Sequence, residues 1–262
     1  MPFSLNNGIR YYSFDIFPRT VKQAVFTRQG GVSPAPWESL NVGGTVGDDV
    51  SRVRENRFRS FAALGRSFDS LFDVWQVHSA DVVYADAPRP PEVDHFKADV
   101  ILTDKPDVTL YMRFADCVPI LMYDRNKNVV GMAHAGWLGT VRGTSTAAVK
   151  AMVEHYGSQP GDIIAAIGPS IGADHYEVGP DVISQVEQAF GTDAKRLIET
   201  RDGRTYLDLW AANRLQLEKS GVQQIEVAGV CTTCHLDDWF SHRGEKGKTG
   251  RFGALIALQS WR

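Results

Sequence analysis

The sequence predicts a mixed α+β fold built as a single domain. Strand-like stretches cluster in the middle of the chain, and stretches with helical spacing occur irregularly around them. No internal repeat, low-complexity segment or clear linker divides the 262 residues, and a chain of this length can bury a large core as one unit. We therefore expect one domain over residues 1–262, with one large mixed sheet or two sheets and flanking helices.

Nine segments have the apolar or alternating pattern of β-strands. In the second of them, alternation would place Val74, Gln76 and His78 on one face. A hairpin is expected between the fifth and the sixth, because Asn126 and Asn128 can adopt a positive φ. The predicted strands are residues 21–27, 71–78, 99–103, 108–114, 119–124, 128–134, 161–168, 224–230 and 252–258.

Four segments have apolar residues at helical spacing and recognisable ends. Asp48 and Asp49 lie at the positive end of the first, and Gly157 closes the second. Pro180 lies in the first turn of the third, and Asp208 caps the fourth. The predicted helices are residues 50–64, 144–156, 180–190 and 208–221.

Composition argues against several classes of function. The formal net charge of -3 gives no basic surface for a nucleic acid. No apolar run approaches the length of a membrane span, and the first residues, MPFSLNNGIRYYSFDIF, lack the pattern of a secretory signal. Three cysteines make a poor disulfide framework. We expect a cytoplasmic protein, a monomer, with neither nucleic acid nor membrane as its partner.

His78, Cys117 and His134 are the residues most indicative of chemistry. Two imidazoles and a thiolate suit zinc, with copper as an alternative, and leave a fourth coordination position open for water or substrate. A strand-end histidine, a loop cysteine and a second strand-end histidine could converge on one point. Taken singly, each has a plainer explanation: a solvated strand face, a small buried cysteine and a tight helix entry.

Several neighbouring residues are candidates for binding an anion or a base. His134 ends a strand before a glycine-containing loop and a helix, which is a common place for an anion. Arginines in glycine-containing loops suit phosphate or carboxylate. The expected substrate or phosphate ligands are Gln76, Gly136, Trp137, Arg142, Arg243 and Arg251, with Arg28 as a further phosphate ligand and Phe114 as an alternative stacking partner.

Cys231 and Cys234 form a separate Cys-x-x-Cys motif that follows a predicted strand. The next residues have weak helical character, which does not suit a thioredoxin-like motif. A structural zinc site would want a second cysteine pair, and the sequence has none. We expect this motif to pack or to form a pocket wall.

The chain resembles the YfiH/laccase-domain family, also called the multicopper polyphenol oxidase or peptidoglycan editing factor family. The resemblance extends from about Phe26 to Leu258. It departs at Ser170, where cysteine is frequent, and at His242, where tyrosine is usual. It is carried by the motifs TRQGGVS, LNVGGTVGDD, QVHSADV, ADCVPILMYD, HAGWLGTVRG, IGPSIGADHYEVG and FSHRGEKGKTGRFGALIAL.

This resemblance implies a four-layer, YfiH-like fold with a central pair of sheets between helices. It implies zinc at His78, Cys117 and His134, and it implies purine nucleoside chemistry. The reactions are phosphorolysis of adenosine, inosine and methylthioadenosine, and deamination of adenosine. Copper-dependent phenol oxidation and the removal of wrongly built cell-wall precursors are also attributed to the family.

Four hypotheses follow. The first is a zinc-dependent purine nucleoside enzyme that takes a nucleoside and phosphate, with Asp116 or Glu177 as proton shuttle. The second is a cysteine hydrolase of peptidoglycan precursors, with Cys117 as nucleophile, a histidine as base and Asp116 as its orienting residue. The third is a copper oxidase. The fourth is a zinc-stabilised binding protein in which Cys231 or Cys234 closes the coordination.

Overall fold

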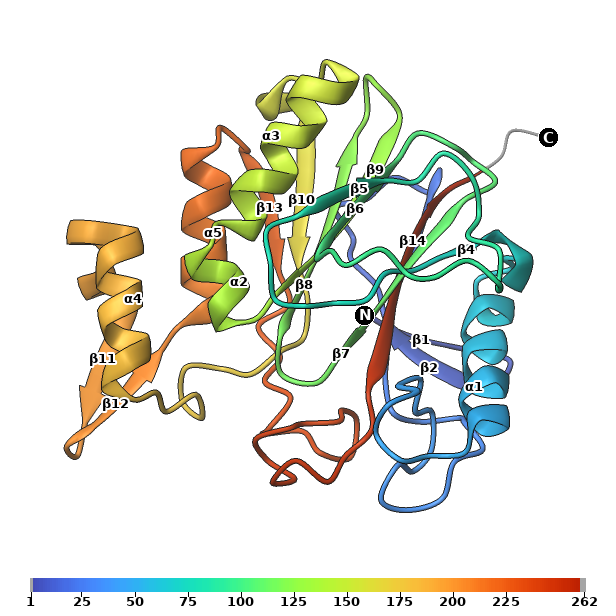
Figure 1. Cartoon of the computed structure of the whole chain (residues 1–262), viewed down its shortest axis with the longest axis horizontal. Helices are drawn as coiled ribbons and strands as arrows, with labels where there is room; N and C mark the ends of the chain where they lie inside the picture. The colour runs from blue at the N-terminus through green and yellow to red at the C-terminus, as the bar shows by residue number, and fades with distance from the viewer. Residues whose placement is uncertain (1, 260–262) are drawn as a thin grey trace.

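Residues 2–259, which the computed structural model describes, form two six-stranded sheets and a separate two-stranded hairpin (Figure 1). The first sheet has the spatial order β1 (Phe3–Asn6), β2 (Ile9–Tyr12), β3 (Val21–Phe26), β14 (Phe252–Leu258), β7 (Thr109–Phe114), β4 (Leu71–Phe72). The second has the order β13 (Gln224–Val227), β10 (Ile163–Ile167), β8 (Val118–Asp124), β9 (Val129–Ala135), β6 (Val100–Thr103), β5 (Val82–Tyr84).

The two sheets share an apolar core. On β14, Ala254, Ile256 and Leu258 belong to this core, whereas Leu255 and Ala257 belong to the core on the opposite face. Because both faces of this strand are covered, its sequence is an uninterrupted apolar run rather than an alternating one.

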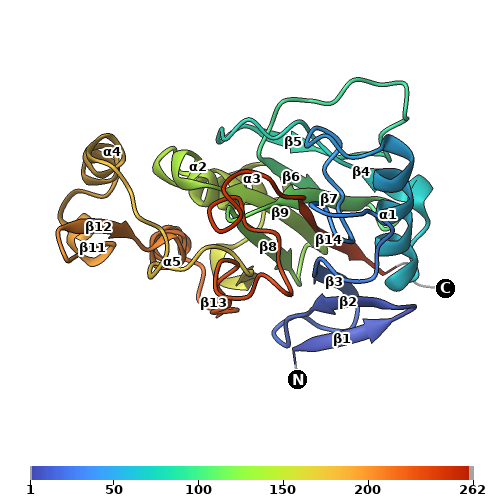
Figure 2. The ribbon, with the colours of Figure 1, turned by 90° about the horizontal axis from the view of Figure 1, so that it is seen from below.

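Helices cover the outer face of each sheet, so the molecule has four layers (Figures 1 and 2). The helix α1 (Val50–Ala63) packs Phe61 against the first sheet. The helices α2 (Trp137–Val141), α3 (Thr144–Tyr156) and α5 (Leu209–Lys219) lie on the second sheet. The four-layer fold implied by the family resemblance is thus confirmed.

The helix α4 (Pro180–Phe190) and the hairpin of β11 (Ile198–Arg201) and β12 (Arg204–Leu207) lie together at the end of the molecule remote from α1 (Figure 2). Short 3₁₀ segments complete the chain: η1 (Phe68–Ser70), η2 (Pro160–Asp162) and η3 (Gly191–Arg196). Within residues 2–259, no helix combines the length and the apolar character needed to cross a bilayer.

The predicted strand over residues 71–78 is wrong beyond Phe72. Trp75 makes only an isolated bridge, and His78 has a φ of 58°. The backbone N–H groups of Val77 and Ser79 donate to the carboxylate of Asp99 instead of to a neighbouring strand. The segment is therefore a loop, which the buried Asp99 side chain helps to hold, and its residues do not alternate between two faces.

Candidate active site

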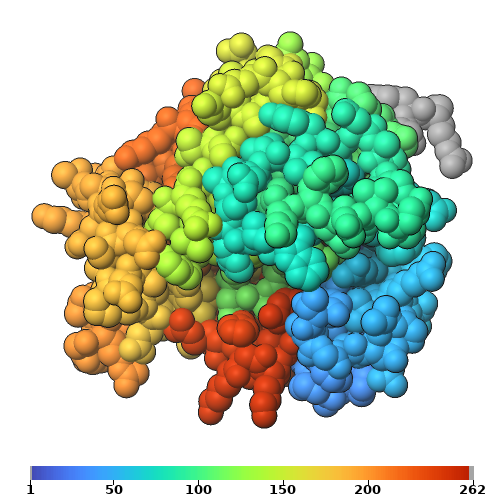
Figure 3. Space-filling model, in the orientation of Figure 1, coloured from blue at the N-terminus to red at the C-terminus, as the bar shows by residue number. Residues whose placement is uncertain are grey.

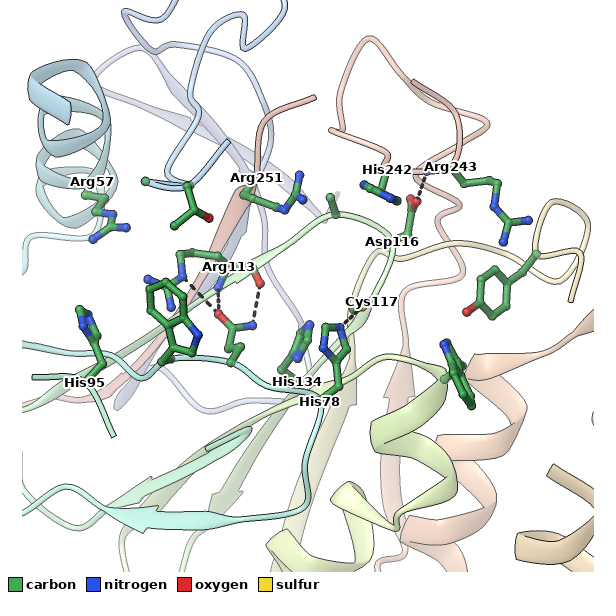
Figure 4. A pocket seen from close by; sticks show the side chains of 18 residues that line it. Arg57, His78, His95, Arg113, Asp116, Cys117, His134, His242, Arg243 and Arg251 are labelled. Atoms are coloured by element: carbon green, nitrogen blue, oxygen red, sulfur yellow. Dashed lines mark hydrogen bonds between the residues drawn. The ribbon is translucent and has the colours of Figure 1, made fainter. Parts of the chain in front are cut away.

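A pocket of about 700 Å³ opens where loops from distant parts of the chain meet. Figure 3 shows the surface hollowed where the red segment near residue 245, the blue segment before α1 and the teal segment before β6 come together. Hydrogen bonds between Val42, Asn41 and Arg251 join the first two of these segments. The lining consists of residues 43–45, 75–76, 78, 115–117 and 242–243, with Arg57, His95, Arg113, His134, Trp137, Tyr176 and Arg251 (Figure 4).

His78, Cys117 and His134 come together in this pocket (Figure 4). One ligand atom of each lies within 4.8 Å of the others, and Cys117 Sγ is 3.8 Å from His78 Nε2. Antiparallel pairing of His134 on β9 with Pro119 on β8 brings the cysteine, two residues before Pro119, to the histidine. Sulfur and nitrogen ligands of a tetrahedral zinc ion lie about 3.5 Å apart, so the trio can hold such an ion with little movement.

Asp99 orients this trio from beneath. Its Oδ1 lies 2.7 Å from His134 Nδ1, which leaves Nε2 as the nitrogen that can bind a metal. Its Oδ2 accepts hydrogen bonds from the backbone N–H groups of Val77 at 3.0 Å and Ser79 at 2.7 Å. One buried carboxylate thus fixes the ring of His134 and both backbone neighbours of His78.

Gly136 allows the trio to pack closely. A Cβ atom at this position would lie 2.7 Å from Cys117 Sγ and 3.1 Å from His78 Cδ2. Its φ of -71° is open to any residue, so the requirement for glycine is space rather than backbone conformation. The absence of a side chain at the N-cap of α2 therefore leaves room for the Cys117 thiol and the His78 ring.

The trio is also electrostatically coupled. Burial raises the pKa of Cys117, but His134 and His78 outweigh burial and lower it to about 6. Burial lowers the pKa of His134, but the Cys117 thiolate and Asp99 outweigh it and raise the pKa to about 9. Between these values the pair exists as thiolate and imidazolium when no metal is bound.

Another part of the pocket is rich in positive charge. Buried Asp73 lies 2.8 Å from Arg89, 3.3 Å from Arg113, 3.8 Å from Arg57 and 3.1 Å from His95. Burial lowers the pKa of Arg113 to about 10, so its guanidinium is still charged at neutral pH. One carboxylate thus faces three guanidinium groups, and the surplus positive charge suits an anion.

A sequence model of the family described as multi-copper polyphenol oxidoreductase laccase matches residues 22–259. The chain belongs to this family. A relative from Deinococcus radiodurans named purine nucleoside phosphorylase is 42% identical, over 91% of this chain and 89% of its own. Purine nucleoside phosphorylase YlmD of Bacillus subtilis is 38% identical, over 89% of this chain and 87% of its own.

Solved structures of the family have the same fold. YlmD from Geobacillus stearothermophilus superposes with a TM-score of 0.92 at 33% identity, covering 99% of both chains. The Bacillus licheniformis protein YfiH superposes with a TM-score of 0.91 at 33% identity, covering 98% of this chain and 99% of its own. The family resemblance stated from the motifs is confirmed.

Five further residues named from the sequence line the pocket: Gln76, Asp116, Trp137, Arg243 and Arg251. Gln76 exchanges hydrogen bonds with the backbone of Arg113. Both carboxylate oxygens of Asp116 accept a hydrogen bond. Oδ1 accepts from Thr232 Oγ1 at 2.7 Å, and Oδ2 accepts from the backbone N–H of Arg243 at 2.6 Å. Asp116 therefore holds two loops in place and is not positioned as an uncommitted proton shuttle.

Arg28, Arg142 and Glu177 are placed outside the lining among the described residues. The Arg28 guanidinium donates to the carbonyls of Glu38 and Leu236 and pairs with Glu245, so its role is to join loops. Arg142 donates to the His78 carbonyl at 2.9 Å and supports the loop of that ligand. Glu177 is exposed, and only its backbone carbonyl contacts Arg243, a residue of the lining.

The sequence reasoning missed Asp99, Arg57, Arg113, His95 and Tyr176. Asp99 was taken as the start of a strand, although a buried aspartate beside an apolar run requires a polar partner. Arg113 lies inside the apolar run VTLYMRF, and a buried arginine there is a comparable signal. Arg57 is one of four arginines between residues 52 and 59, and nothing in the sequence distinguishes it.

We expect Asp99→Asn to weaken metal binding by about 10–100-fold, because an outer hydrogen-bond partner fixes the tautomer and orientation of a metal-binding histidine. The measurement is competition for zinc against a chromophoric chelator. Asp81→Asn is the control, since Asp81 is an exposed aspartate on the loop that carries His78. Equal zinc affinity in Asp99→Asn and the unaltered protein would contradict the role given to Asp99.

Proposed function

We propose that this chain is a zinc-dependent purine nucleoside phosphorylase. The proposed substrates are adenosine, inosine and methylthioadenosine with inorganic phosphate, and the proposed second reaction is deamination of adenosine. The observation that carries the proposal is the presence, in one pocket, of the His78, Cys117 and His134 trio together with Arg57 and Arg113. The names of the relatives support the same class of reaction.

The Cys/His/His donor set fits zinc with one coordination position left for another ligand. When bound, zinc supplies a Lewis acid that polarises a substrate atom or activates water. The ligand set alone also suits copper, and metal analysis of the purified protein separates the two.

Phosphorolysis requires the chain to bind phosphate beside C1′ of the ribose. An oxygen of phosphate forms a bond to C1′ while the bond from C1′ to the purine nitrogen breaks, and the purine leaves with the electron pair and gains a proton. Arg57, Arg113 and Arg251 are assigned to phosphate because they line the pocket and carry the surplus charge. Trp137 and Tyr176 are assigned to the nucleoside because their aromatic faces line the same pocket.

The leaving purine needs a proton donor, and we assign this role to His242. It lines the pocket beside Asp116 (Figure 4), and histidine is the side chain that most often acts as a general acid. Asp116 keeps a positioning role, since its carboxylate already accepts two hydrogen bonds from the surrounding loops.

The direct test is incubation of the metal-analysed protein with adenosine or inosine, with and without phosphate, and identification of the products by mass. Phosphorolysis gives the free base and ribose 1-phosphate only when phosphate is present. Deamination converts adenosine into inosine and ammonia without phosphate. Unchanged nucleosides in the presence of zinc-loaded protein would contradict the proposal.

We expect Arg57→Gln to raise the KM for phosphate by about 10–100-fold, since a hydrogen bond to a charged group contributes roughly 1.5–3 kcal/mol. Arg57 Nε donates to the Val42 carbonyl, and Nη1 is 3.8 Å from Asp73, so the guanidinium is held in place with capacity for another anion. Initial rates at varied phosphate measure this KM. Arg59→Gln, on the exposed side of the same helix, is the control. An unchanged phosphate KM in Arg57→Gln would move the phosphate site elsewhere.

A metal-free cysteine hydrolase acting on peptidoglycan precursors is the second candidate. Cys117, His134 and Asp99 lie in the order of a nucleophile, a base and an orienting carboxylate, with Asp99 in the place expected for Asp116. The hydrolase would be active in protein that contains no metal, whereas the phosphorylase would be active only with the metal bound.

The coupled pair predicts how Cys117 reacts when metal has been removed. Its pKa of about 6 means that the thiolate, which is the reactive form, increases as pH rises through 6. Iodoacetamide labelling should therefore rise with a midpoint near pH 6. Cys234, whose pKa is raised to about 12 by burial and neighbouring Cys231 and Asp174, should remain largely unlabelled at neutral pH. Peptide mass spectrometry measures the extent of labelling at each cysteine. A midpoint above pH 8 for Cys117 would contradict the lowering of its pKa by His134 and His78.

A further inference from the structure

We propose that Asp174, His175, Cys231 and Cys234 form a second metal site, which holds a structural zinc ion. One ligand atom of each residue lies within 4.8 Å of the others, and the four come from two loops far apart in sequence. This site is distinct from the trio in the pocket, and it does not depend on the proposed function.

Three of the donor-atom separations match those of a tetrahedral site, and the fourth, between Asp174 and His175, is shorter. His175 Nδ1 lies 3.5 Å from Cys234 Sγ and 3.8 Å from Cys231 Sγ. Asp174 Oδ2 lies 3.3 Å from Cys234 Sγ and 3.0 Å from His175 Nδ1. Tetrahedral zinc bonds of about 2.0–2.3 Å place neighbouring donor atoms about 3.3–3.8 Å apart. The four side chains can therefore close around an ion without rearranging the loops.

The chemistry of the four donors also fits zinc. Two thiolates, an imidazole and a carboxylate fill a coordination shell of four and leave no position open, which is typical of a structural site. Asp174 and His175 take the places that a second cysteine pair would occupy in a four-cysteine zinc site. Both thiols are free rather than joined in a disulfide.

The backbone around the cluster is arranged for a buried thiolate. The Gly172 N–H donates to Cys231 Sγ at 3.2 Å. A Cβ atom on Gly172 would lie 2.5 Å from Asp174 Oδ1 and 3.2 Å from Cys231 Cβ, so a larger residue would displace two of the proposed ligands. Such outer contacts are characteristic of ligands held in place for a metal.

A metal here would tie together two loops, one of which lines the pocket while the other holds Asp116 in place. Tyr176, which follows His175, lines the pocket, and Thr232, which follows Cys231, donates to the carboxylate of Asp116 at 2.7 Å. The ion would thus fix the position of Asp116, which directly precedes Cys117 in the chain. Its role is support of the site, because none of the four ligands belongs to the lining among the described residues.

The test is metal analysis of the full chain, produced with added zinc and purified under reducing conditions. The Cys234→Ser variant should contain about one zinc equivalent per chain less than the unaltered protein, because a tetrahedral site loses affinity when one ligand is removed. Asp174→Ala should lose the same zinc equivalent. This variant provides the test if Cys234→Ser does not fold. His235→Gln is the control, since His235 is an exposed histidine next to Cys234.

Cobalt substitution separates this site from the trio. In Cys117→Ser protein, thiolate-to-cobalt charge-transfer absorption should persist, and it should vanish in the variant that also carries Cys234→Ser. Equal zinc content in folded Cys234→Ser and unaltered protein would overturn the second site. So would a disulfide between Cys231 and Cys234 in protein freshly purified with reductant. Because the zinc difference is read without substrate, failure of the phosphorylase proposal would leave this result unaffected.

Discussion

Replacing Cys117 with serine should release the metal from the pocket and lower kcat/KM for inosine phosphorolysis by more than about 10³-fold, since even outer partners of a metal ligand cost 10–100-fold. Cys117 is the thiolate of the trio, 3.8 Å from His78 and coupled to buried His134. A hydroxyl in its place is a much weaker zinc ligand than a thiolate. The change replaces one sulfur atom with oxygen just before β8, so we expect the fold to be kept.

Zinc content distinguishes the reasons for such a loss. We expect His78→Ala to lose the same zinc as Cys117→Ser, because each removes one of the three ligands. Thermal unfolding confirms that both variants are folded. If Cys117→Ser retained its zinc but lost activity, the cysteine would act as a nucleophile. If it retained both, the trio would not be the active site.

Gly136→Ala should lower kcat/KM by about 10²-fold, because a displacement of about 1 Å at a reacting centre is enough for such a loss. The added Cβ would lie 2.7 Å from Cys117 Sγ and 3.1 Å from the ring of His78, so two ligands must move. The φ of -71° is open to alanine, so the variant should fold, with only the small loss of stability that alanine causes at an N-cap. Activity and zinc affinity are the measurements.

Gly179→Ala is a matched control for this variant. Gly179 also precedes a helix, has a φ of -83°, and would have no heavy atom within 4 Å of an added Cβ. It should keep full activity and full zinc content. Equal activity in the two alanine variants would show that the close packing at Gly136 is not required by the metal site.

Two helices whose ends carry a distinct chemical signal, α3 and α4, were predicted with the bounds that the structure gives. The helix α3 covers the predicted residues 144–156 and ends at Gly157, which has a φ of 70°. The helix α4 covers the predicted residues 180–190, beginning at Pro180. Asp49 and Asp208 cap α1 and α5 through their side chains. These signals are local, so they can be recognised without tertiary contacts.

Two hairpins were missed although their turns were visible. Asn7 and Gly8 join β1 to β2, and Asp202 and Gly203 join β11 to β12, all four with positive φ. Asn-Gly and Asp-Gly are strong signals for such turns. The flanking strands have four residues each and are partly exposed, so they show little apolar pattern.

The site was partly predictable for the same reason. Histidine and cysteine are chemically distinctive, and the structure brings His78, Cys117 and His134 together as the sequence suggested. Asp99 and Arg113 act through contacts across sheets and loops, which no local pattern encodes. Arg28 illustrates the opposite case, because an arginine in a glycine-containing loop was equally consistent with a structural contact.

The most direct test of the account is removal and return of the metal. Zinc would be stripped from the protein with a chelator, the chelator removed, and phosphate-dependent release of hypoxanthine from inosine followed while zinc is added back. We predict that activity is lost with the metal and returns with zinc but not with magnesium, and that Cys117→Ser does not recover. Full phosphorolysis by protein free of metal would contradict it.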